Sequence, residues 1–362
     1  MSNELFKQMQ IKSYRHTYEL EFVDNFIDTL ARNHQDGDTI IVDQTVCRLY
    51  PALAQWLETR HHIMIEANEA TKSFAQLSEF IETLIENNFT RANRLIAIGG
   101  GVTQDITSFI ASILFRGTNW LFFPTTLLTQ CDSCIGSKTS INFGRYKNQL
   151  GSFFPPQSIF VDTVFLTTLP QSEKRSGLGE MLHYYLVTSE ADLQMVEAFG
   201  DQALVDDTVL RRFIARSLEI KKAMIEVDEF DQGPRAIFNY GHSFGHAIEA
   251  ATQNAVPHGI AVAYGMDLAN LISVELGLIP KELRNRIRLS LAKSFTGTEL
   301  PDIDVDLIFG ALRKDKKNQG KDIKVILTRG IGDMYKTTLQ CNDQVNDCIH
   351  DFFNNRRYEQ AL

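Results

Sequence analysis

One segment, LIAIGGGVTQDITSFIASILF at residues 95–115, constrains the fold of this chain most strongly. Apolar residues 95–98 predict a buried strand, glycines follow at 99–101, and a helical pattern starts at Val102. A strand that turns through glycines into a helix presents backbone N–H groups to a phosphate in parallel α/β sheets. Because the triplet differs from the usual dinucleotide-binding spacing, an ordinary tight turn remains the alternative.

Strands and helices alternate on both sides of this segment. Residues 39–43 (TIIVD) predict a short buried strand that ends in an aspartate, and residues 73–88 carry apolar side chains at helical spacing. The run WLFFPTTLL starts a further strand and leads into Thr125 and Thr126, whose hydroxyls suit ribose or phosphate. This alternation predicts a parallel sheet with helices on both faces.

After Gly177 the pattern becomes helical. The predicted helices cover residues 178–198, 207–227, 236–252, 259–277 and 281–293. A chain of 362 residues is longer than one ordinary hydrophobic core accommodates, so two domains are expected. We place the first over residues 1–170 and the second over residues 171–362.

Charge and composition exclude several classes of partner. The net charge of -9 argues against a surface for nucleic acids or anionic membranes, although a local basic pocket is compatible with it. The N-terminus lacks the apolar core of a signal peptide. The longest apolar region, residues 260–278, is interrupted by Asp267, Asn270 and Glu275, so it predicts a buried helix and not a membrane span.

The chain has five cysteines at irregular spacing, which is not a disulfide framework. A reducing compartment, the cytoplasm, is therefore expected. Cys131 and Cys134 form a C-x-x-C motif, but no second such motif completes a zinc site. We therefore assign no redox or metal role to the pair.

Three of the nine histidines lie in RAIFNYGHSFGHAIEAATQNAVPHG, residues 235–259. His242 and His246 are four residues apart and so lie on one face of a helix. His258 follows Pro257 after a break. With a carboxylate from elsewhere in the chain, these imidazoles can build a metal site, and hydrogen-bonded surface histidines are the alternative.

Residues 124–156 form a polar segment that is rich in Gly, Ser, Thr, Asn and Lys and poor in apolar periodicity. A long polar loop beside a nucleotide site is usually functional. Lys138 and Lys147 in this segment can contact an anionic substrate. The alternative is a solvated loop with surface lysines.

A set of motifs, in order along the chain, resembles the 3-dehydroquinate synthase family, the founding branch of the sugar phosphate cyclases. They are GGGVTQD (99–105), FRG (115–117), PTTLL (124–128), DSCIGSKTSIN (132–142), KNQLGSFFPP (147–156), GLGE (177–180), RAIFNYGHSFGHAIE (235–249), HG (258–259) and DKK (315–317). The resemblance implies a Rossmann-like parallel-sheet NAD domain, a mainly α-helical metal and substrate domain, and an active site in the cleft between them.

The resemblance also implies individual site residues. The metal ligands are Glu180, His242 and His258, with Zn²⁺ or Co²⁺ as the ion. The NAD positions are Asp43, Glu69, Lys72, Gly100, Gly101, Val102, Asp105, Thr125, Thr126, Leu128, Asp132, Lys138, Lys147, Phe165, Thr168 and Leu169. The substrate and catalytic positions are Arg116, Lys138, Asn148, His183, Lys221, Arg235, Asn239, His246 and Lys317. Arg116 resembles the arginine that family members insert into the neighbouring subunit's site, which implies a homodimer.

Three positions depart from the family pattern. Thr45 replaces an asparagine, and Asn68 replaces the glycine of the family's GEXXKS element, which NEATKS (68–73) resembles. His183 stands where the family has a lysine that contacts the substrate. An imidazole is shorter than a lysine side chain and only partly charged near neutral pH, so it cannot reproduce the lysine's reach or constant charge.

The implied reaction is the NAD- and metal-dependent conversion of a heptulosonate 7-phosphate to a carbocycle, with elimination of phosphate and an intramolecular aldol closure. Another cyclase acting on sedoheptulose 7-phosphate, glucose 6-phosphate or an aminosugar phosphate is the first alternative, and His183 is its best support. A metal-dependent polyol dehydrogenase is the second alternative. Arg235 and Asn239 are retained, which favours a carboxylated substrate.

Overall fold

The computed structural model describes residues 7–144, 146–298, 300–314 and 322–354. The chain forms two compact units, the first from residues 1–169 and 221–230 and the second from residues 170–220 and 231–362. The predicted boundary at residue 170 stays a prediction, and the short segment 221–230 groups with the first unit.

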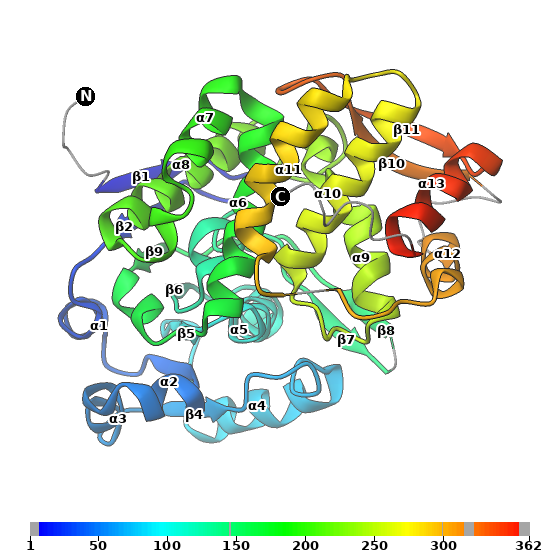
Figure 1. The fold of residues 1–362 in the computed structure, drawn as a ribbon. Helices are drawn as coiled ribbons and strands as arrows, with labels where there is room; N and C mark the ends of the chain where they lie inside the picture. The colour runs from blue at the N-terminus through cyan, green and yellow to red at the C-terminus, as the bar shows by residue number, and fades with distance from the viewer. Residues whose placement is uncertain (1–6, 145, 299, 315–321, 355–362) are drawn as a thin grey trace. The chain divides into compact units, whose positions relative to one another are not determined.

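A seven-stranded sheet forms the centre of the first unit (Figure 1). Its strands, in spatial order, are β1 (Gln8–Ile11), β2 (Tyr18–Phe22), β9 (Ser158–Val161), β6 (Trp120–Pro124), β5 (Leu95–Gly99), β3 (Thr39–Asp43) and β4 (His62–Ile65). Only the β1–β2 pair is antiparallel. Strands β5 and β6 are buried along their whole length, as their continuous apolar sequences require.

The helices of the first unit connect these strands. They are α1 (Phe26–Asn33), α2 (Gln44–Leu49), α3 (Pro51–Leu57), α4 (Phe74–Glu86) and α5 (Gly101–Ile113), with short helical turns at Leu114–Arg116, Thr129–Ser133 and Thr163–Thr167. The predicted strand–glycine–helix segment is present as β5 and α5. The predicted polar loop contains a helical turn and a hairpin of β7 (Ile141–Phe143) and β8 (Tyr146–Leu150), so it is more ordered than expected.

The second unit is mainly helical, as expected. Its helices are α6 (Gln171–Thr188), α7 (Glu190–Phe199), α8 (Asp207–Ile225, whose last residues group with the first unit), α9 (His242–Ala251), α10 (His258–Glu275), α11 (Lys281–Phe295), α12 (Val305–Lys314) and α13 (Asp343–Asn354). Short 3-10 turns lie at Gln202–Leu204 and Pro234–Asn239. The hairpin of β10 (Asp322–Thr328) and β11 (Met334–Gln340) was not predicted.

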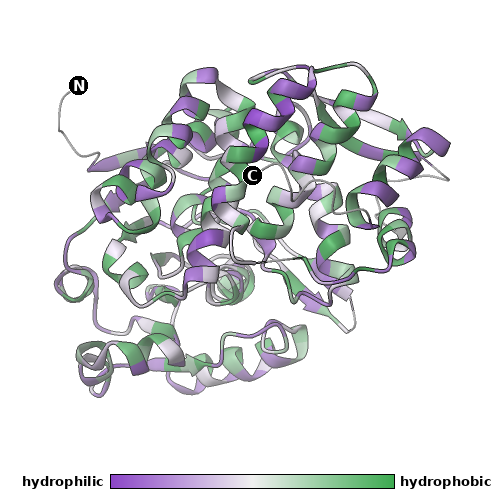
Figure 2. Cartoon of the chain, viewed as in Figure 1, coloured by the Kyte–Doolittle hydropathy of each residue, from purple (hydrophilic) through white to green (hydrophobic). Residues whose placement is uncertain are grey.

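Helix α10 is the core of the second unit and packs against α6, α9 and α11. Helix α10 is buried over most of its length because its own residues are apolar on nearly all sides. Helix α11 instead carries both hydrophobic and hydrophilic residues (Figure 2). Glycines bring the neighbours of α10 close. A Cβ on Gly179 of α6 would lie 2.2 Å from the carbonyl oxygen of Gly259, and one on Gly259 would lie 1.8 Å from that of Ser176.

Two predicted helices are interrupted. The helix predicted over 178–198 ends at Thr188, and Ser189 then caps α7 by accepting a hydrogen bond from the Asp192 amide. The helix predicted over 236–252 is broken at Gly241, whose φ of 79° lies in the left-handed region. Among the residues described, no helix is both long and apolar enough to cross a membrane.

Candidate active site

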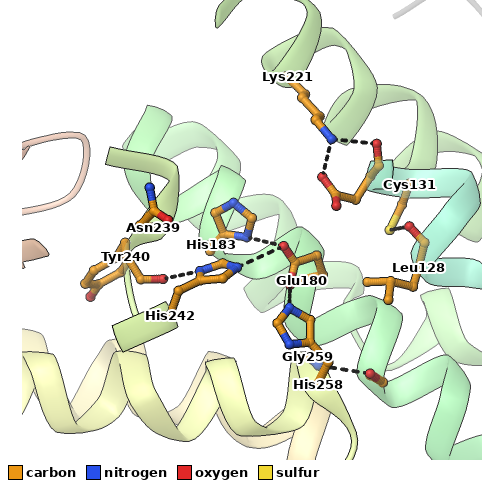
Figure 3. Close-up of polar contacts among 12 residues, drawn as sticks. Leu128, Cys131, Glu180, His183, Lys221, Asn239, Tyr240, His242, His258 and Gly259 are labelled. Carbon is orange, nitrogen blue, oxygen red and sulfur yellow. Dashed lines mark hydrogen bonds and ion pairs between the residues drawn. The ribbon is translucent and has the colours of Figure 1, made fainter. Parts of the chain in front are cut away.

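A buried carboxylate surrounded by imidazoles lies in the second unit (Figure 3). Oε1 of Glu180 is 3.5 Å from Nε2 of His242, and its Oε2 is 3.6 Å from Nε2 of His258. The donor atoms of these three residues lie within 4.8 Å of one another. Ligands bound at about 2.0–2.1 Å with tetrahedral angles are separated by about 3.3 Å, so the three side chains fit a small divalent cation such as Zn²⁺.

Three helices bring these ligands together. Glu180 comes from the middle of α6, and His242 and His258 are the first residues of α9 and α10. The close contact of α6 and α10 at Gly179 and Gly259 places the carboxylate next to the start of α10. The metal ligands named from the sequence therefore meet in one place.

Electrostatics keep the central carboxyl group charged. Burial of Glu180 would by itself raise its pKa, but the imidazoles of His183, His242 and His258 outweigh burial and hold that pKa well below its usual range. Its Oε2 accepts no hydrogen bond from any described residue. A buried carboxylate oxygen without a donor is a costly arrangement that a bound cation relieves.

His183, the departure from the family pattern, is part of this cluster. Its side chain is 1% exposed, and Nδ1 lies 3.4 Å from Oε1 of Glu180 (Figure 3). Its ring meets those of His242 and Phe238 edge-on, at centroid distances of 5.3 and 5.9 Å. The imidazole is therefore directed toward Glu180, a predicted metal ligand, which the sequence alone does not indicate.

Other predicted substrate residues of the second unit lie near these histidines. His246 is exposed, and its ring centroid is 5.6 Å from that of His242 and 5.7 Å from that of His258. Arg235 is 6% exposed in the 3-10 turn before α9, and Asn239 ends that turn with its amide donating to the carbonyl oxygen of Ala236.

One residue of the site was missed from the sequence. Oε2 of Glu249 lies 3.1 Å from Nδ1 of His258. Burial would raise the pKa of Glu249, but the hydrogen bond to His258 and the electrostatic attraction of His258, His246 and His242 together outweigh burial and lower that pKa. The available signal was spacing, because His242, His246 and Glu249 are at i, i+4 and i+7 and so share one face of α9.

In the first unit, the start of α5 fits a diphosphate. The helix has no side-chain cap, so its first backbone N–H groups are available to an anion. A Cβ on Gly100 would lie 2.9 Å from the methyl group of Thr126, whereas a Cβ on Gly101 would have no described neighbour within 4 Å. Val102 and Asp105 follow within the first turns of the same helix.

Further NAD positions follow the carboxyl ends of neighbouring parallel strands. Asp43 ends β3, and its side chain accepts a hydrogen bond from the Thr45 amide as the cap of α2. Thr125, Thr126 and Leu128 follow β6, and Phe165, Thr168 and Leu169 follow β9. Ends of parallel strands meet at one edge of a sheet, which is where nucleotides bind in such folds. The Phe165 side chain instead packs in the core against Phe26.

A second group of predicted cofactor residues is linked by hydrogen bonds. Nζ of Lys72 is 2.6 Å from Oδ2 of Asp105. The Ser140 amide donates a hydrogen bond to Oδ1 of the same carboxylate, and the Ser140 hydroxyl donates one to Oδ2. Burial raises the pKa of Asp105, and the Lys72 ammonium opposes that rise. Glu69 accepts a hydrogen bond at 2.8 Å from the Asn142 amide, which is part of β7.

Polar residues at and near the β7–β8 hairpin are exposed. Lys138, Lys147 and Asn148 are accessible to solvent, and Asn148 has a φ of 52°. Asn148 accepts a hydrogen bond from the Ser140 hydroxyl, which joins it to the Asp105 group. The structure therefore associates Asn148 with the predicted cofactor residues.

The remaining predicted substrate residues are Lys221, Arg116 and Lys317. Nζ of Lys221 is 2.7 Å from both the carbonyl oxygen and Oδ1 of Asp132, so in this structure the ammonium contacts a predicted NAD residue (Figure 3). Arg116 is exposed in a turn where it and Phe115 both have positive φ angles, 65° and 52°. Lys317 lies outside the described residues.

The C-x-x-C motif is buried in the first unit. Cys131 and Cys134 are 0% and 2% exposed, and burial raises the pKa of the Cys134 thiol to about 12. Among the described residues, neither cysteine belongs to a potential metal-binding group. A protonated, inaccessible thiol is unreactive.

We therefore expect Cys131 and Cys134 to remain unmodified when the native protein is treated with iodoacetamide. Cys341 is partly exposed and should be labelled first. Mass spectrometry of peptides would locate the label, and treatment in denaturant should label all five cysteines. Rapid labelling of either motif cysteine in the native protein would contradict the buried placement.

A glycine turn at a helix start on a parallel sheet, together with two histidines around a buried glutamate, characterises nucleotide-binding metalloenzymes. Residues 62–176 match the 3-dehydroquinate synthase N-terminal family and residues 177–318 match its C-terminal counterpart. The 3-dehydroquinate synthase of Bartonella tribocorum is 34% identical over 352 residues, which cover 91% of this chain and 93% of the relative. The chain belongs to the 3-dehydroquinate synthase family.

Solved structures show the same fold. A 2-deoxy-scyllo-inosose synthase complexed with carbaglucose-6-phosphate, NAD⁺ and Co²⁺ has a TM-score of 0.85 at 23% identity, over 95% of this chain and 100% of that one. The 2-epi-5-epi-valiolone synthase of Streptomyces hygroscopicus, with NAD⁺ and Zn²⁺ bound, has a TM-score of 0.79 at 26% identity, over 92% and 96%. The predicted fold class is confirmed.

Proposed function

We propose that this chain is a phosphate-eliminating cyclase that converts a heptulosonate 7-phosphate to a carbocycle, using NAD and a divalent metal. The observation that carries the proposal is the buried Glu180 carboxylate facing Nε2 atoms of His242 and His258. Curated relatives are named 3-dehydroquinate synthase, among them a protein of Streptococcus pyogenes whose alignment covers 90% of this chain. Solved relatives contain NAD⁺ with Co²⁺ or Zn²⁺.

When bound, NAD would supply the acceptor and later the donor of a hydride, and a metal would polarise the hydroxyl group on the substrate carbon that gives up the hydride. The protein supplies the surroundings. The lowered pKa of Glu180 keeps it an anion that can hold a cation. The Nδ1 of His242 lies 3.2 Å from the Tyr240 carbonyl oxygen, which directs its other nitrogen to Glu180. Glu180, His242 and His258 would hold the metal, and the start of α5 would hold the NAD diphosphate.

Anion recognition falls to cationic and polar side chains. Arg235 is nearly buried, and a guanidinium in that environment can bind a carboxylate or phosphate in exchange for water. His246 is exposed beside two proposed metal ligands, where its imidazole can hydrogen-bond a phosphate oxygen. Arg235 and Asn239 support a carboxylated substrate over a simple alcohol, which needs no such donors.

His183 determines how the proposal should be tested. Lysine at this position would bring a permanent charge, whereas the imidazole lies 3.4 Å from the Glu180 carboxylate and is 1% exposed. We infer that the substrate's anionic group is bound here without that lysine, by the remaining cationic residues. The natural substrate must therefore be measured and not assumed from the family.

The test is release of inorganic phosphate from a panel of sugar phosphates with NAD and Zn²⁺ present. We expect turnover of 3-deoxy-arabino-heptulosonate 7-phosphate without net NADH, and weaker turnover of sedoheptulose 7-phosphate and glucose 6-phosphate. His183→Lys should keep this preference and change kcat/KM by about tenfold, equivalent to roughly 1.4 kcal/mol. Preferred turnover of an uncarboxylated phosphate, or net NADH accumulation from a polyol, would refute the proposal.

Assembly and location are also part of the proposal. The exposed Arg116, in a turn with two successive positive φ angles, supports a homodimer in which this side chain reaches the neighbouring subunit's site. The five cysteines are free, which supports a reducing, cytoplasmic location. Light scattering would give the number of subunits for the native chain and for Arg116→Ala. Activity measured on the same samples separates an effect on assembly from an effect on catalysis.

A further inference from the structure

His258 lies between two carboxylates, one facing each ring nitrogen. Its Nε2 is 3.6 Å from Oε2 of Glu180, and its Nδ1 is 3.1 Å from Oε2 of Glu249. The second distance is that of a hydrogen bond, whereas the first leaves room for a cation between the two donors. The two contacts therefore differ in kind.

A neutral imidazole has one N–H and one bare nitrogen, and only the bare nitrogen can bind a metal. A carboxylate cannot donate a proton when ionised, so Glu249 can only accept one from Nδ1 of His258. The proton is then on Nδ1, and Nε2 presents its lone pair toward Glu180. Glu249 is thus placed to select the tautomer that a metal at Glu180 requires.

The same arrangement is found at the second imidazole. Nδ1 of His242 lies 3.2 Å from the carbonyl oxygen of Tyr240, and its Nε2 faces Glu180. Both imidazoles thus use an acceptor on Nδ1 and direct Nε2 to the same carboxylate. The acceptor of His242 is backbone and cannot be removed by substitution, but the acceptor of His258 is a side chain.

The scaffold around Glu249 restricts its position. Glu249 is in the last turn of α9, and its side chain is 19% exposed. Helix α9 lies close to α10 at Gly245, because this residue has no side chain. A Cβ there would be 3.0 Å from the Val262 backbone. The carboxylate and the ring of His258 therefore belong to two helices in close contact, which limits how far either can move.

We propose that Glu249 is a positioning residue of the metal site, which accepts the Nδ1 proton of His258 and so fixes the tautomer and ring orientation of this ligand. The proposal rests on the metal site of the proposed function. Glu249 contacts a metal ligand and has no contact with the reacting atoms in this account.

Glu249 could instead be a metal ligand itself, and that role would give a different measured result. The donor atoms of His246, Glu249 and His258 lie within 4.8 Å of one another, as a metal site of their own would need. That site would compete with the first for His258, because a neutral imidazole offers one bare nitrogen. The 3.1 Å contact favours a hydrogen bond, so we expect one ion per chain.

The experiment measures Zn²⁺ affinity by competition with a chromophoric chelator, and metal content by elemental analysis. Outer partners of metal-bound histidines typically contribute about 10–100-fold in affinity, so Glu249→Ala should weaken Zn²⁺ binding by that factor at one ion per chain. Glu249→Gln keeps an acceptor oxygen without charge and should lose less. His258→Ala should lose more than either.

A spectroscopic measurement separates positioning from a general loss of stability. The visible spectrum of the Co²⁺-loaded protein reports ligand geometry, and we expect it to shift in Glu249→Ala and to return toward the native form in Glu249→Gln. Glu197→Gln is the matched control, because it changes a carboxylate of a surface ion pair with Arg286. Thermal unfolding of the metal-free proteins identifies any variant that fails to fold.

Three outcomes would overturn the proposal. Glu249→Ala could bind Zn²⁺ within twofold of the native chain with an unchanged Co²⁺ spectrum. The native chain could bind two ions and the variant one, which would assign Glu249 as a ligand. If the native chain and His258→Ala bound metal equally, the metal site of the proposed function would fail with it, and this result is distinct from the other two.

Discussion

His242→Ala and His258→Ala should each remove the bound metal and lower turnover by about a thousandfold. A metal that polarises a reacting oxygen contributes several kcal/mol, and each 1.36 kcal/mol corresponds to a factor of ten. Each substitution also leaves the Glu180 carboxylate buried with fewer imidazole partners. Elemental analysis and phosphate release, measured on the same samples, check the two effects together.

The control for this experiment is His61→Ala, because His61 is exposed in the first unit. It should bind metal and turn over substrate as the native chain does. Removing the ion with a chelator should abolish turnover of the native chain, and added Zn²⁺ or Co²⁺ should restore it. An active His258→Ala protein that contains no metal would contradict the assignment of this ligand.

Gly259→Ala should destabilise the second unit by about 3 kcal/mol or more, at the upper end of the usual cost of overpacking. A Cβ at this position would lie 1.8 Å from the carbonyl oxygen of Ser176 and 3.1 Å from the amide nitrogen of Glu180. Both are backbone atoms of α6, so the contact cannot be relieved by rotating a side chain. Denaturant unfolding measures the loss of stability.

The matched control is Gly310→Ala on α12, where a Cβ would meet nothing within 4 Å. Alanine is the better helix former, so this change should be neutral or stabilise by about 0.5–1 kcal/mol. Because Gly259 follows His258 directly, its replacement should also weaken metal binding, whereas Gly310→Ala should not. Equal effects of the two substitutions would show that the helix contact does not position the ligands.

Much of the fold was predictable because its signals are local. The strand β5 and the helix α5 follow from a short apolar run, three glycines and a helical period, all within 19 residues of sequence that need no distant partner. The central helix α10 was recognised from its apolar length and its polar interruptions. The parallel sheet followed from the alternation of such elements.

The break at Gly241 could not be predicted, because its cause lies in another helix. A Cβ there would be 2.6 Å from the Val262 carbonyl oxygen of α10, and a single sequence does not contain that contact. The β10–β11 hairpin was missed for a similar reason, since its pairing depends on tertiary packing more than on local propensity.

The candidate site, like the fold, was predictable in part. The ligand trio was named through a family resemblance, and the structure brings its members together, while the roles of the other named residues stay predictions. Contacts of individual side chains were beyond the sequence. Neither the approach of His183 to Glu180 nor that of Glu249 to His258 follows from residue type, because both depend on how α6, α9 and α10 pack.

The position of the two histidines at the beginnings of α9 and α10 has a consequence for charge. The aligned peptide dipoles of a helix leave about half a positive charge at its N-terminus. Both histidines are therefore next to a partial positive charge of their own helix. In the proposed site, a divalent ion held by one carboxylate and two imidazoles would keep a net positive charge, and the two helix ends would add to it. The centre is therefore suited to an oxygen that becomes negative during the reaction.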